Sequence, residues 1–345
     1  MKVLHLLNSN IFSGAERVAI NLIKASRPEV EAVYCSPYGS IKDVLEKNNI
    51  KYLKLNRFNY KNLDKVLNEY NPDIIHAHDF KSSLLASRFS KQYKIISHIH
   101  QDPKWFKKVN LQTITYLIAS NSIDKIIFVS KHTYSDFKFK KLISKKVAVI
   151  HNAIDIQKII SLSKEFQPTN FDLIYVGRFE DAKNPLEFVD LVHELKKKNK
   201  AIVAAMVGSG SLVTSISKKI SKLELQNNIT LTGFADNPYK YMAHSKICVI
   251  PSKNEGFSLA AIEAGVIGIP VVGNNVGGLG EVLDIIGAPK TNSFDELADK
   301  CSFLLKNLSY RKALSEKESK ASQLNFSLIQ LKTKIVSIYK EIAEW

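Results

Sequence analysis

The sequence has little cysteine and no long apolar run. Its three cysteines, Cys35, Cys248 and Cys301, lie far apart and form no C-x-x-C pair. This spacing argues against a disulfide framework and a cysteine-based zinc site, and it fits a reducing compartment. No window approaches about 18 uninterrupted apolar residues, so we expect no membrane-spanning helix. We therefore expect the protein to be cytoplasmic.

Other common signals are missing as well. The sequence contains no internal repeat and no low-complexity tract. The apolar run in the N-terminal segment MKVLHLLNSN is too short for a secretory leader. This segment therefore predicts a first β-strand.

The sequence predicts alternating strands and helices, and this pattern occurs once in each half of the chain. Short apolar runs bounded by turn residues predict strands, and segments with helical spacing lie between them. This alternation is typical of doubly wound α/β domains with parallel sheets. The predicted strands are Val3–Leu7, Val30–Cys35, Ile74–Ala77, Ile95–Ile99, Lys125–Val129, Val147–Ile150, Leu173–Val176, Ile202–Val207, Ile229–Thr232, Ile247–Ile250 and Ile269–Val272. The predicted helices include Glu16–Lys24, Ser82–Lys91, Pro185–Lys198 and Leu212–Leu223.

The length of 345 residues suits two domains better than one. The segment Asp155–Asn170 has little periodicity and contains Pro168, so it predicts a linker. We expect a first domain over residues 1–160 and a second over 166–325. A terminal helix is expected over about residues 326–345.

The net charge of +16 is unevenly distributed. Residues 1–165 contain 27 Lys and Arg against 14 Asp and Glu, whereas residues 166–345 contain 22 against 19. The net charges of the two halves are therefore +13 and +3. This imbalance favours an anionic surface or substrate near the first domain.

The most informative stretch is Ile250–Gly278, IPSKNEGFSLAAIEAGVIGIPVVGNNVGG. It predicts a strand, a loop with Glu255, and a helix that starts near Ser258 and carries Glu263. Helix N-termini offer backbone N–H groups to anions, and carboxylates accept hydrogen bonds from sugar hydroxyls. A ligand with both phosphate and sugar is therefore expected. The amides in question belong to Gly256, Phe257, Ser258 and Leu259.

The motif EGFSLAAIEAG, with Glu255 and Glu263 eight positions apart, resembles the paired-glutamate signature of glycosyltransferase family 4. These are retaining enzymes of the GT-B fold. The resemblance implies two Rossmann-like domains that face a cleft, with a terminal helix that packs on the first domain. It also implies a nucleotide-sugar donor, UDP- or GDP-linked, as a substrate, with no cofactor and no metal. An acidic D-x-D pair for magnesium is absent from the sequence.

Two further motifs match the family's phosphate contacts. Gly14 follows the first strand and opens the first helix, where glycine lets a phosphate approach the backbone. It is not part of a G-x-G-x-x-G pattern. Gly177 and Arg178, with Lys183 five positions later, resemble the family's phosphate clamp, in which the two cations stabilise the departing diphosphate.

Histidines end two predicted strands. His98 and His100 share one face of their strand, and the family places an active-site histidine there that contacts the donor sugar. Periodicity does not distinguish the two, and we favour His100 because it lies farther toward the carboxyl end. His76 and His78 are expected to be structural. Neither pair has H-E-x-x-H spacing, so metal binding is not expected.

Three weaker matches complete the resemblance. Gly233 and Phe234, in the sequence LTGF, resemble the family's nucleobase edge. In the family's asparagine-glycine-x-aspartate hinge, Ala153 replaces glycine, which puts the tight turn in doubt. Gly280 stands where proline is common, so a more flexible loop is expected there.

By this resemblance the chain transfers a sugar to an acceptor glycan or lipid-linked glycan, in cell-surface polysaccharide synthesis. Glu263 would hold the ribose and Glu255 the sugar hydroxyls. One alternative is a nucleotide-sugar 2-epimerase of the same fold. The other is a basic nucleic-acid-binding protein, but the phosphate motifs lie in the less basic half, so no nucleic-acid partner is expected.

An anionic membrane surface is a further expected partner. Lys104–Lys108 and Lys131–Lys146 both lie in the basic half, and both contain aromatic residues. Lysines near an anionic bilayer contribute about 1 kcal/mol each, and aromatic side chains insert at the interface. The protein is therefore expected to be peripheral on the inner face of the membrane.

Overall fold

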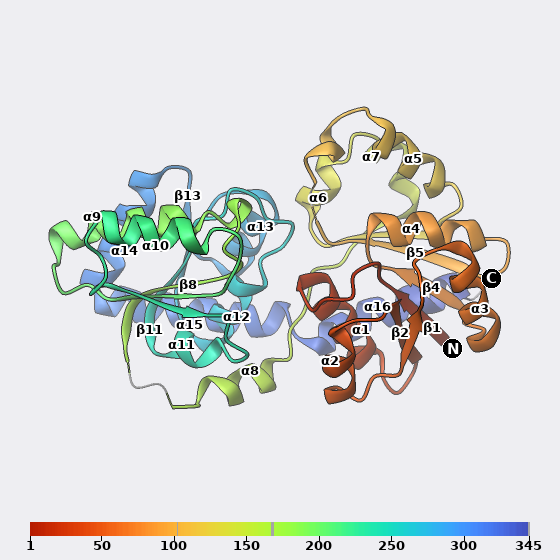
Figure 1. The fold of residues 1–345 in the computed structure, drawn as a ribbon, viewed down its shortest axis with the longest axis horizontal. Helices are drawn as coiled ribbons and strands as arrows, with labels where there is room; N and C mark the ends of the chain where they lie inside the picture. Colours follow the sequence, from red (N-terminus) through yellow and green to blue (C-terminus); the bar gives the residue numbers. More distant parts are fainter. Residues whose placement is uncertain (102, 167–168, 344–345) are drawn as a thin grey trace. The chain divides into compact units, whose positions relative to one another are not determined.

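The computed structural model describes residues 1–101, 103–166 and 169–343. The chain divides into two compact units, one formed by Met1–Ala153 with Leu328–Trp345 and the other by Ile154–Ser327. Each unit is a parallel β-sheet with helices on both faces (Figure 1). The predicted fold class of two doubly wound α/β domains is confirmed.

The first unit contains a seven-stranded sheet in the order β3-β2-β1-β4-β5-β6-β7, and all its strand pairs are parallel. Its strands are β1 (Lys2–Leu6), β2 (Glu31–Pro37), β3 (Tyr52–Leu55), β4 (Ile74–Ala77), β5 (Lys94–Ile99), β6 (Lys125–Phe128) and β7 (Val147–Val149). Its helices are α1 (Gly14–Ser26), α2 (Ile41–Lys47), α3 (Tyr60–Tyr70), α4 (Phe80–Ala86), α5 (Leu111–Ser120), α6 (Lys131–Asp136), α7 (Lys140–Ile143) and α16 (Leu328–Ala343), with short 3₁₀ turns at Ser87–Phe89, Lys104–Lys107 and Ser144–Lys146.

Alternating strand residues build two cores in this unit. On one face, Val3, Ile74 and Ile96 pack against α1, α2 and α16. On the other face, Leu4, Ile75 and Ile95 pack against α3, α4 and α5. Because both faces are covered, the central strands are mainly apolar on both sides, with His5, His76 and His98 as buried polar exceptions. The terminal helix α16 thus belongs to the first unit, where it packs on α1.

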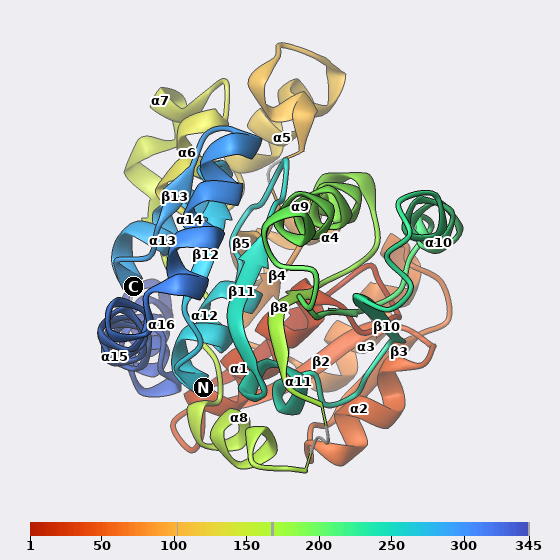
Figure 2. The ribbon, with the colours of Figure 1, turned by 90° about the vertical axis from the view of Figure 1, so that its left-hand side faces the viewer.

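The second unit contains a six-stranded sheet in the order β10-β9-β8-β11-β12-β13. Figure 2 shows the labelled strands β13, β12, β11, β8 and β10 in this order across the view. The strands are β8 (Phe171–Val176), β9 (Ala204–Val207), β10 (Ile229–Gly233), β11 (Ser245–Ile250), β12 (Val271–Asn274) and β13 (Lys290–Thr291). The helices are α8 (Ile156–Ser163), α9 (Pro185–Lys198), α10 (Val213–Lys222), α11 (Tyr239–Ala243), α12 (Leu259–Ile267), α13 (Gly277–Ile286), α14 (Phe294–Lys306) and α15 (Leu308–Asn325), with a 3₁₀ turn at Asp181–Lys183.

Helices α9, α10 and α14 cover one face of this sheet, where Phe188 and Ile216 join the core with strand residues such as Leu173. Helix α12 packs against α8, α11 and α15 on the other face. Figure 1 shows α9, α10 and α14 above the strands and α11, α12 and α15 below them. None of the helices in the described residues combines the length and the apolarity needed to cross a bilayer.

Several expectations need correction. The segment 155–170 is not a plain linker, because residues Ile156–Ser163 form α8 and the division between the units falls after Ala153. Pro168 lies outside the described residues. Asp155 caps α8 by accepting the Lys158 N–H at 3.2 Å, so this motif starts a helix.

The expected flexible loop around Gly280 is also wrong. Gly280 is buried inside α13. The side chain of Asn275 lies 2.7 Å from where a Cβ of residue 280 would stand, so proline or alanine at this position would force a local shift.

Glu318 is a fully buried carboxyl of the second unit, away from the loops at the carboxyl ends of the strands. Glu318 on α15 accepts the Val271 N–H at the start of β12, at 2.9 Å, and its other oxygen finds no partner among the described residues. Burial raises the pKa of this carboxyl to about 8, against the opposing effect of the Val271 N–H. Glu318 is therefore protonated in the folded protein at neutral pH.

This pKa predicts a specific pH dependence. Between about pH 5 and pH 8 the unfolded chain loses a proton that the folded chain retains, so the stability of the wild type should fall by up to about 1.4 kcal/mol per pH unit. Glu318→Gln stays neutral and keeps the acceptor oxygen, so its advantage over the wild type should grow as the pH rises. Urea unfolding midpoints at pH 5, 6.5 and 8 measure it.

Glu316→Gln is the matched control for this substitution, because Glu316 is an exposed residue of the same helix. Its stability should follow that of the wild type at all three pH values. If the stability of wild type and of Glu318→Gln changed with pH in the same way, Glu318 would be ionised in the folded state.

Candidate active site

Three glycines meet at the carboxyl ends of neighbouring strands in the second unit. Gly177 follows β8, Gly208 follows β9 and Gly233 ends β10. The Gly208 N–H donates to the Gly233 carbonyl at 2.9 Å, and a Cβ on Gly208 would stand 1.9 Å from the Gly177 oxygen. Only glycine fits at Gly208, whose φ is +149°. This is the edge of a doubly wound sheet where ligands bind.

The loops after β8 and β11 are joined by an ion pair. Lys183 Nζ lies 2.5 Å from Glu255 Oε1, and Glu255 is only 7% exposed. Ser252 Oγ donates to the same carboxylate oxygen at 3.2 Å. The backbones are joined too, because the Lys253 N–H donates to the carbonyl of Ala182 at 2.9 Å. Two of the predicted site residues, Lys183 and Glu255, are therefore in direct contact.

Tyr175 of β8 forms a hydrogen bond with the loop that carries Arg178. Its hydroxyl donates to the Arg178 carbonyl at 2.9 Å, and burial raises the pKa of this phenol. The side chain of Arg178 is exposed. The backbone at Arg178 is thus fixed by Tyr175 while its guanidinium group remains open to solvent.

The loop of Glu255 is also fixed by the start of α13. The Gly278 N–H donates to the Glu255 carbonyl at 2.7 Å. Gly277 has φ +53°, and a Cβ there would stand 2.2 Å from the same carbonyl oxygen. The N-terminus of α13 can therefore approach Glu255 this closely only because residue 277 is glycine.

Helix α12 begins next to this loop. Ser258 is its extended N-cap, and Leu259 is its first residue. Within the described residues, the Ser258 side chain makes no capping hydrogen bond. Phe257 is buried, with its ring 5.8 Å from that of Phe326, so its side chain serves packing.

Glu263 lies in the second turn of α12 and is 4% exposed. The Tyr239 hydroxyl donates to Glu263 Oε1 at 3.2 Å. The residue therefore combines a buried carboxylate with a place near the start of a helix.

The end of β10 differs from this buried site. Gly233 has φ +72° and Phe234 is 72% exposed, so this aromatic ring is available to a ligand.

The sequence reasoning missed the loop after β9. The Phe179 N–H donates to the Ser209 carbonyl at 2.8 Å, and Glu180 accepts both the N–H and the hydroxyl of Ser211, at 3.0 and 2.6 Å. The sequence GSGS directly after an apolar strand was the signal that could have identified this loop. It lies beside the loop that carries Arg178.

Gly14 and His100 belong to the first unit. Gly14 is the first residue of α1, and a Cβ there would meet nothing within 4 Å. The fold of this unit therefore does not itself require glycine at that position. His100 follows β5 and is half-buried, whereas His98 within β5 is 1% exposed. Asp102, which ends this motif, lies outside the described residues.

The four histidines of the two pairs lie in one cluster, together with His5 of β1. His76 Nδ1 lies 2.7 Å from the Tyr339 hydroxyl, and His76 Nε2 lies 3.2 Å from His98 Nδ1. His78 Nε2 lies 2.8 Å from His5 Nδ1. His78 Nδ1 lies 2.9 Å from His100 Nε2. Both ring nitrogens of His76 and of His78 thus have partners within the first unit.

Burial lowers the pKa of all five imidazoles, to about 3 for His5 and His100. Desolvation is the largest cause in each case, because it penalises the charged ring. The five histidines are therefore neutral at physiological pH. Each neutral ring offers one donor and one acceptor nitrogen.

Comparison with protein families agrees with this geometry. Residues 12–158 match the model described as Glycosyltransferase Family 4, and residues 157–321 match the model described as Glycosyl transferases group 1. Two Rossmann-like units with these matches define a glycosyltransferase of the GT-B fold. The chain belongs to glycosyltransferase family 4.

Relatives with assigned names cover most of the chain. The capsular polysaccharide biosynthesis glycosyltransferase CapH of Staphylococcus aureus is 29% identical over 354 residues, which cover 96% of this chain and 98% of CapH. The O-antigen biosynthesis glycosyltransferase WclY of Escherichia coli is 26% identical, with 99% of both chains covered. An Escherichia coli UDP-Gal:alpha-D-GlcNAc-diphosphoundecaprenol alpha-1,3-galactosyltransferase is 24% identical, over 81% of this chain and 80% of that enzyme.

Solved structures share the fold. HepE of Anabaena, in complex with UDP, superposes with a TM-score of 0.87 at 19% identity, covering 99% of this chain and 100% of HepE. The lipopolysaccharide outer core galactosyltransferase WaaB gives a TM-score of 0.74 at 16% identity, with 99% and 100% covered. At these identities the similarity establishes the GT-B fold.

The close approach at Gly277 generates a prediction. Gly277→Ala would place a side chain against the Glu255 carbonyl at a backbone angle that disfavours it, so the loop of Glu255 must shift. We expect a loss of stability of about 1–3 kcal/mol. Thermal unfolding monitored by circular dichroism measures the loss.

Gly14→Ala is the control, because residue 14 has open space around it. It should unfold at or above the wild-type temperature. If both variants lost equal stability, the contact between Gly277 and Glu255 would not be the cause.

Proposed function

We propose that this glycosyltransferase transfers a sugar from a UDP- or GDP-sugar to a glycan acceptor, with retention of the anomeric configuration. The observation that carries the proposal is the arrangement in the second unit. Within it, the Lys183–Glu255 ion pair, the exposed Arg178 and the N-terminus of α12 all lie on loops after neighbouring strands. Cations and helix amides bind a diphosphate, and the buried carboxylates accept hydroxyl donors.

Each residue has a defined role in this proposal. As the bond between the sugar carbon and the diphosphate oxygen breaks, the electron pair stays on the oxygen, and Arg178, Lys183 and the α12 amides stabilise the new charge. A diphosphate also competes with Glu255 for Lys183. Released in this way, Glu255 accepts hydrogen bonds from the sugar hydroxyls, while Glu263 accepts those of the ribose.

The other predicted site residues have supporting roles. The exposed ring of Phe234 and the backbone at Gly233 hold the nucleobase, and the family resemblance assigns His100 a contact with the donor sugar. Gly14 leaves room for the diphosphate, in agreement with the open space around its Cα. The donor is a substrate, so the reaction uses no organic cofactor.

Relatives support cell-surface polysaccharide synthesis as the setting. CapH is named for capsular polysaccharide and WclY for O-antigen biosynthesis, and the galactosyltransferase is named for a diphosphoundecaprenol-linked acceptor. HepE was solved with UDP. All three relatives are named as glycosyltransferases, so they give no support to a 2-epimerase. We infer a lipid-linked glycan as the acceptor.

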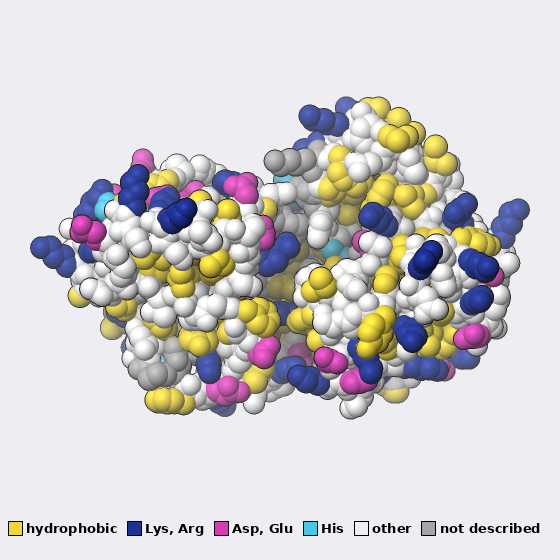
Figure 3. Space-filling model, viewed as in Figure 1, with side chains coloured by type: hydrophobic (Ala, Val, Ile, Leu, Met, Phe, Trp, Pro, Cys, Tyr) yellow, Lys and Arg dark blue, Asp and Glu magenta, His cyan; other side chains and the backbone are white. Residues whose placement is uncertain are grey.

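We also propose that the first unit docks on an anionic membrane, through α5 and its neighbours. Helix α5 exposes a stripe of apolar side chains, with Leu111 80%, Ile114 40% and Ile118 65% exposed. These positions share one helix face. Exposed lysines lie at Lys107 and Lys108 before the helix and at Lys131, Lys138, Lys141 and Lys145 in the later segment whose Phe137 packs on Tyr116 of α5. Figure 3 shows hydrophobic side chains and lysines together over α5 and α7.

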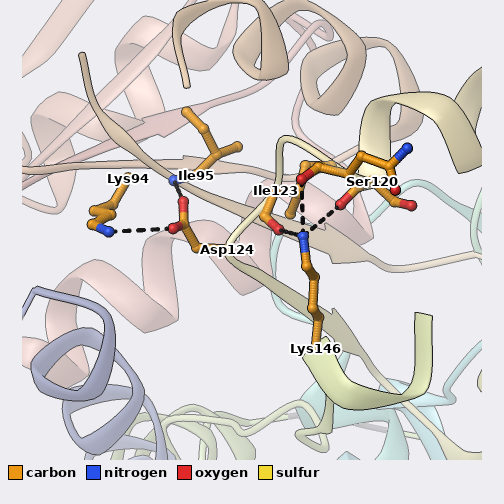
Figure 4. Close-up of polar contacts among 7 residues, drawn as sticks. Lys94, Ile95, Ser120, Ile123, Asp124 and Lys146 are labelled. Atoms are coloured by element: carbon orange, nitrogen blue, oxygen red, sulfur yellow. Dashed lines mark hydrogen bonds and ion pairs between the residues drawn. The ribbon is translucent and has the colours of Figure 1, made fainter. Parts of the chain in front are cut away.

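The sequence predicted that aromatic side chains of these segments insert into the membrane, but two of those side chains are not exposed to solvent. Phe106 and Phe137 are buried, and their rings lie 5.2 Å apart, so they fasten the segment of α6 and α7 to the start of α5. Lys146 is not available either. Its ammonium donates to the carbonyls of Ser120, Asn121 and Ile123 at 3.0, 3.0 and 2.8 Å and so caps the end of α5 (Figure 4).

The reaction is tested with a panel of UDP- and GDP-sugars. The wild type should release nucleoside diphosphate slowly from one or a few of them, even without acceptor, and faster with a lipid-linked glycan. In the product, the proton–proton coupling at the anomeric carbon, measured by NMR, should match that of the donor. Release from none of the donors, or an inverted product, would refute the corresponding part of the proposal.

Arg178→Ala then tests the phosphate contact. Loss of one charge-stabilising donor should lower kcat about 100-fold or more at saturating donor. Lys253→Ala is the matched control, because Lys253 is an exposed cation of the neighbouring loop that pairs with Asp181 at 2.6 Å. It should keep near-wild-type kcat.

Membrane docking is tested separately by vesicle sedimentation. The wild type should pellet with phosphatidylglycerol-rich vesicles and less so with neutral ones, and salt should weaken the binding. The double variant Leu111→Ser with Ile118→Ser should lose most of it. Ile329→Ser on α16, an equally exposed apolar residue at 76%, should bind like the wild type. Equal pelleting of wild type with anionic and neutral vesicles at low salt would contradict the docking surface.

A further inference from the structure

The histidine cluster of the first unit occupies a place where a parallel sheet usually carries aliphatic side chains. Lower on the same face, the strands carry Val3, Ile74 and Ile96, which are ordinary core residues. Four of the five histidines are at most 1% exposed. The members are His5 of β1, His76 of β4, His78 directly after β4, His98 of β5, and His100 directly after β5.

Three of these rings form a chain of hydrogen bonds that ends at His100. His5 Nδ1 lies 2.8 Å from His78 Nε2, and His78 Nδ1 lies 2.9 Å from His100 Nε2. The backbone of His78 is fixed as well, because its N–H donates to the Leu6 carbonyl of β1 at 3.0 Å. The two end atoms of the chain, His5 Nε2 and His100 Nδ1, are buried and find no partner among the described residues.

The number of protons in this chain restricts it to two arrangements. Each contact joins an Nδ1 to an Nε2, so it needs one N–H and one lone pair. A neutral imidazole has one of each, and His78 can therefore donate to one neighbour only while it accepts from the other. All three rings carry their proton on Nδ1, or all three carry it on Nε2. The tautomer of His100 is thus tied to those of His78 and His5.

The buried end at His5 distinguishes the two arrangements. With every proton on Nε2, His5 buries an N–H that has no acceptor, whereas with every proton on Nδ1 it buries only a lone pair. Among backbone groups, buried N–H donors without a partner are rarer than unsatisfied acceptors, and the same preference favours protons on Nδ1 here. His5 is 0% exposed, while His100 is half-buried. The Nδ1 arrangement therefore leaves the free donor on the residue that borders solvent.

We propose that His5 and His78 are positioning residues that hold His100 with its proton on Nδ1, so that His100 donates a hydrogen bond to the nucleotide sugar. The contact between His100 and this substrate rests on the proposed function. The arrangement of the protons, by contrast, is a property of the ligand-free protein. Hydroxyl and phosphate oxygens both accept hydrogen bonds, so a fixed N–H suits this ligand class. The contact of Nε2 with His78 also fixes the orientation of the His100 ring.

Nitrogen NMR of the ligand-free protein with isotope-labelled histidines tests the arrangement directly. Protonated and bare ring nitrogens resonate at clearly separate frequencies, and His5, His78 and His100 should each show the proton on Nδ1. The signals are assigned with the single variants His5→Gln, His78→Asn and His100→Gln. Any two assignments decide the outcome, because the three rings must agree. Protons on Nε2, or different tautomers in the three rings, would overturn the proposal.

Substitution of His78 tests the consequence for activity. His78→Leu removes the donor to His100 Nε2, so His100 should show both tautomers. The kcat/KM for the nucleotide sugar should fall about tenfold, roughly the effect of one lost hydrogen bond. His78→Asn keeps an N–H at the place of Nδ1, so it should restore most of kcat/KM and the single tautomer of His100. A merely structural role of His78 predicts no such rescue and no change in the His100 signals, and this result would contradict the proposal.

Tyr339→Phe is the matched control, because Tyr339 belongs to a second chain in the same cluster. Its hydroxyl lies 2.7 Å from His76 Nδ1, and His76 Nε2 lies 3.2 Å from His98 Nδ1. Among the described residues, no hydrogen bond joins this second chain to His100. Tyr339 is as deeply buried as His78, at 0% against 1% exposed. The variant should keep the tautomer of His100 and a kcat/KM near that of the wild type.

Two outcomes separate this proposal from its alternatives. If Tyr339→Phe lowered kcat/KM as much as His78→Leu, a general disturbance of the cluster would be the cause, and the positioning role would be wrong. If the wild type used no nucleotide sugar, the proposed function would fail, and the NMR spectra of the ligand-free protein would still decide where the protons lie.

Discussion

The ion pair between Lys183 and Glu255 is the interaction on which the candidate site depends. A carboxylate that is 7% exposed needs a cation or several donors, because removal from water is costly. Lys183 supplies the cation, Ser252 supplies a hydroxyl, and the start of α13 fixes the backbone of Glu255 through Gly278. The ion pair thus joins the loops after β8 and β11, and the backbone of Glu255 joins them to the start of α13. A substrate that carries both phosphate and hydroxyl groups can replace each half of this pair.

Glycine makes the rest of this edge possible. Gly208 and Gly277 each stand so close to a backbone carbonyl, at Gly177 and at Glu255, that no side chain fits. The loops can therefore approach one another closely enough for backbone amides to line a binding edge. The open position at Gly14 is different, because the fold does not demand glycine there.

The first unit combines an ordinary fold with two unusual features, a buried cluster of histidines and an exposed apolar helix face. Its buried histidines are held neutral by desolvation and are connected to α16 through Tyr339. Its helix α5 exposes leucine and isoleucine to solvent, while the aromatic residues nearby are buried. Both features cost stability in an isolated domain, since one buries polar rings and the other exposes apolar side chains. Such costs are typical of surfaces and clusters that bind a partner.

The sequence by itself determined the fold class, the family and most of the elements. Short apolar runs predicted the strand Ile74–Ala77, and they predicted Leu173–Val176 where the structure has Phe171–Val176, because buried parallel strands are mainly apolar on both faces. It did not predict β3, which has only four residues, or α3, and it took α8 for a linker. The motif around Glu255 and Glu263 identified the family, which the matches confirm. The assigned roles of the site residues stay predictions.

Only the tertiary structure decided which of these residues touch. The local sequence pattern does not show that Lys183 forms an ion pair with Glu255, 72 positions later. It also does not show that His5 of β1 contacts the histidine pairs that follow other strands. It also could not show that Phe137 turns inward while Leu111 and Ile118 face solvent. Hydrophobic periodicity assigns one face of an element to the interior. Which side chains then meet depends on strand order and on helix packing, and these are set by contacts between residues far apart in the chain.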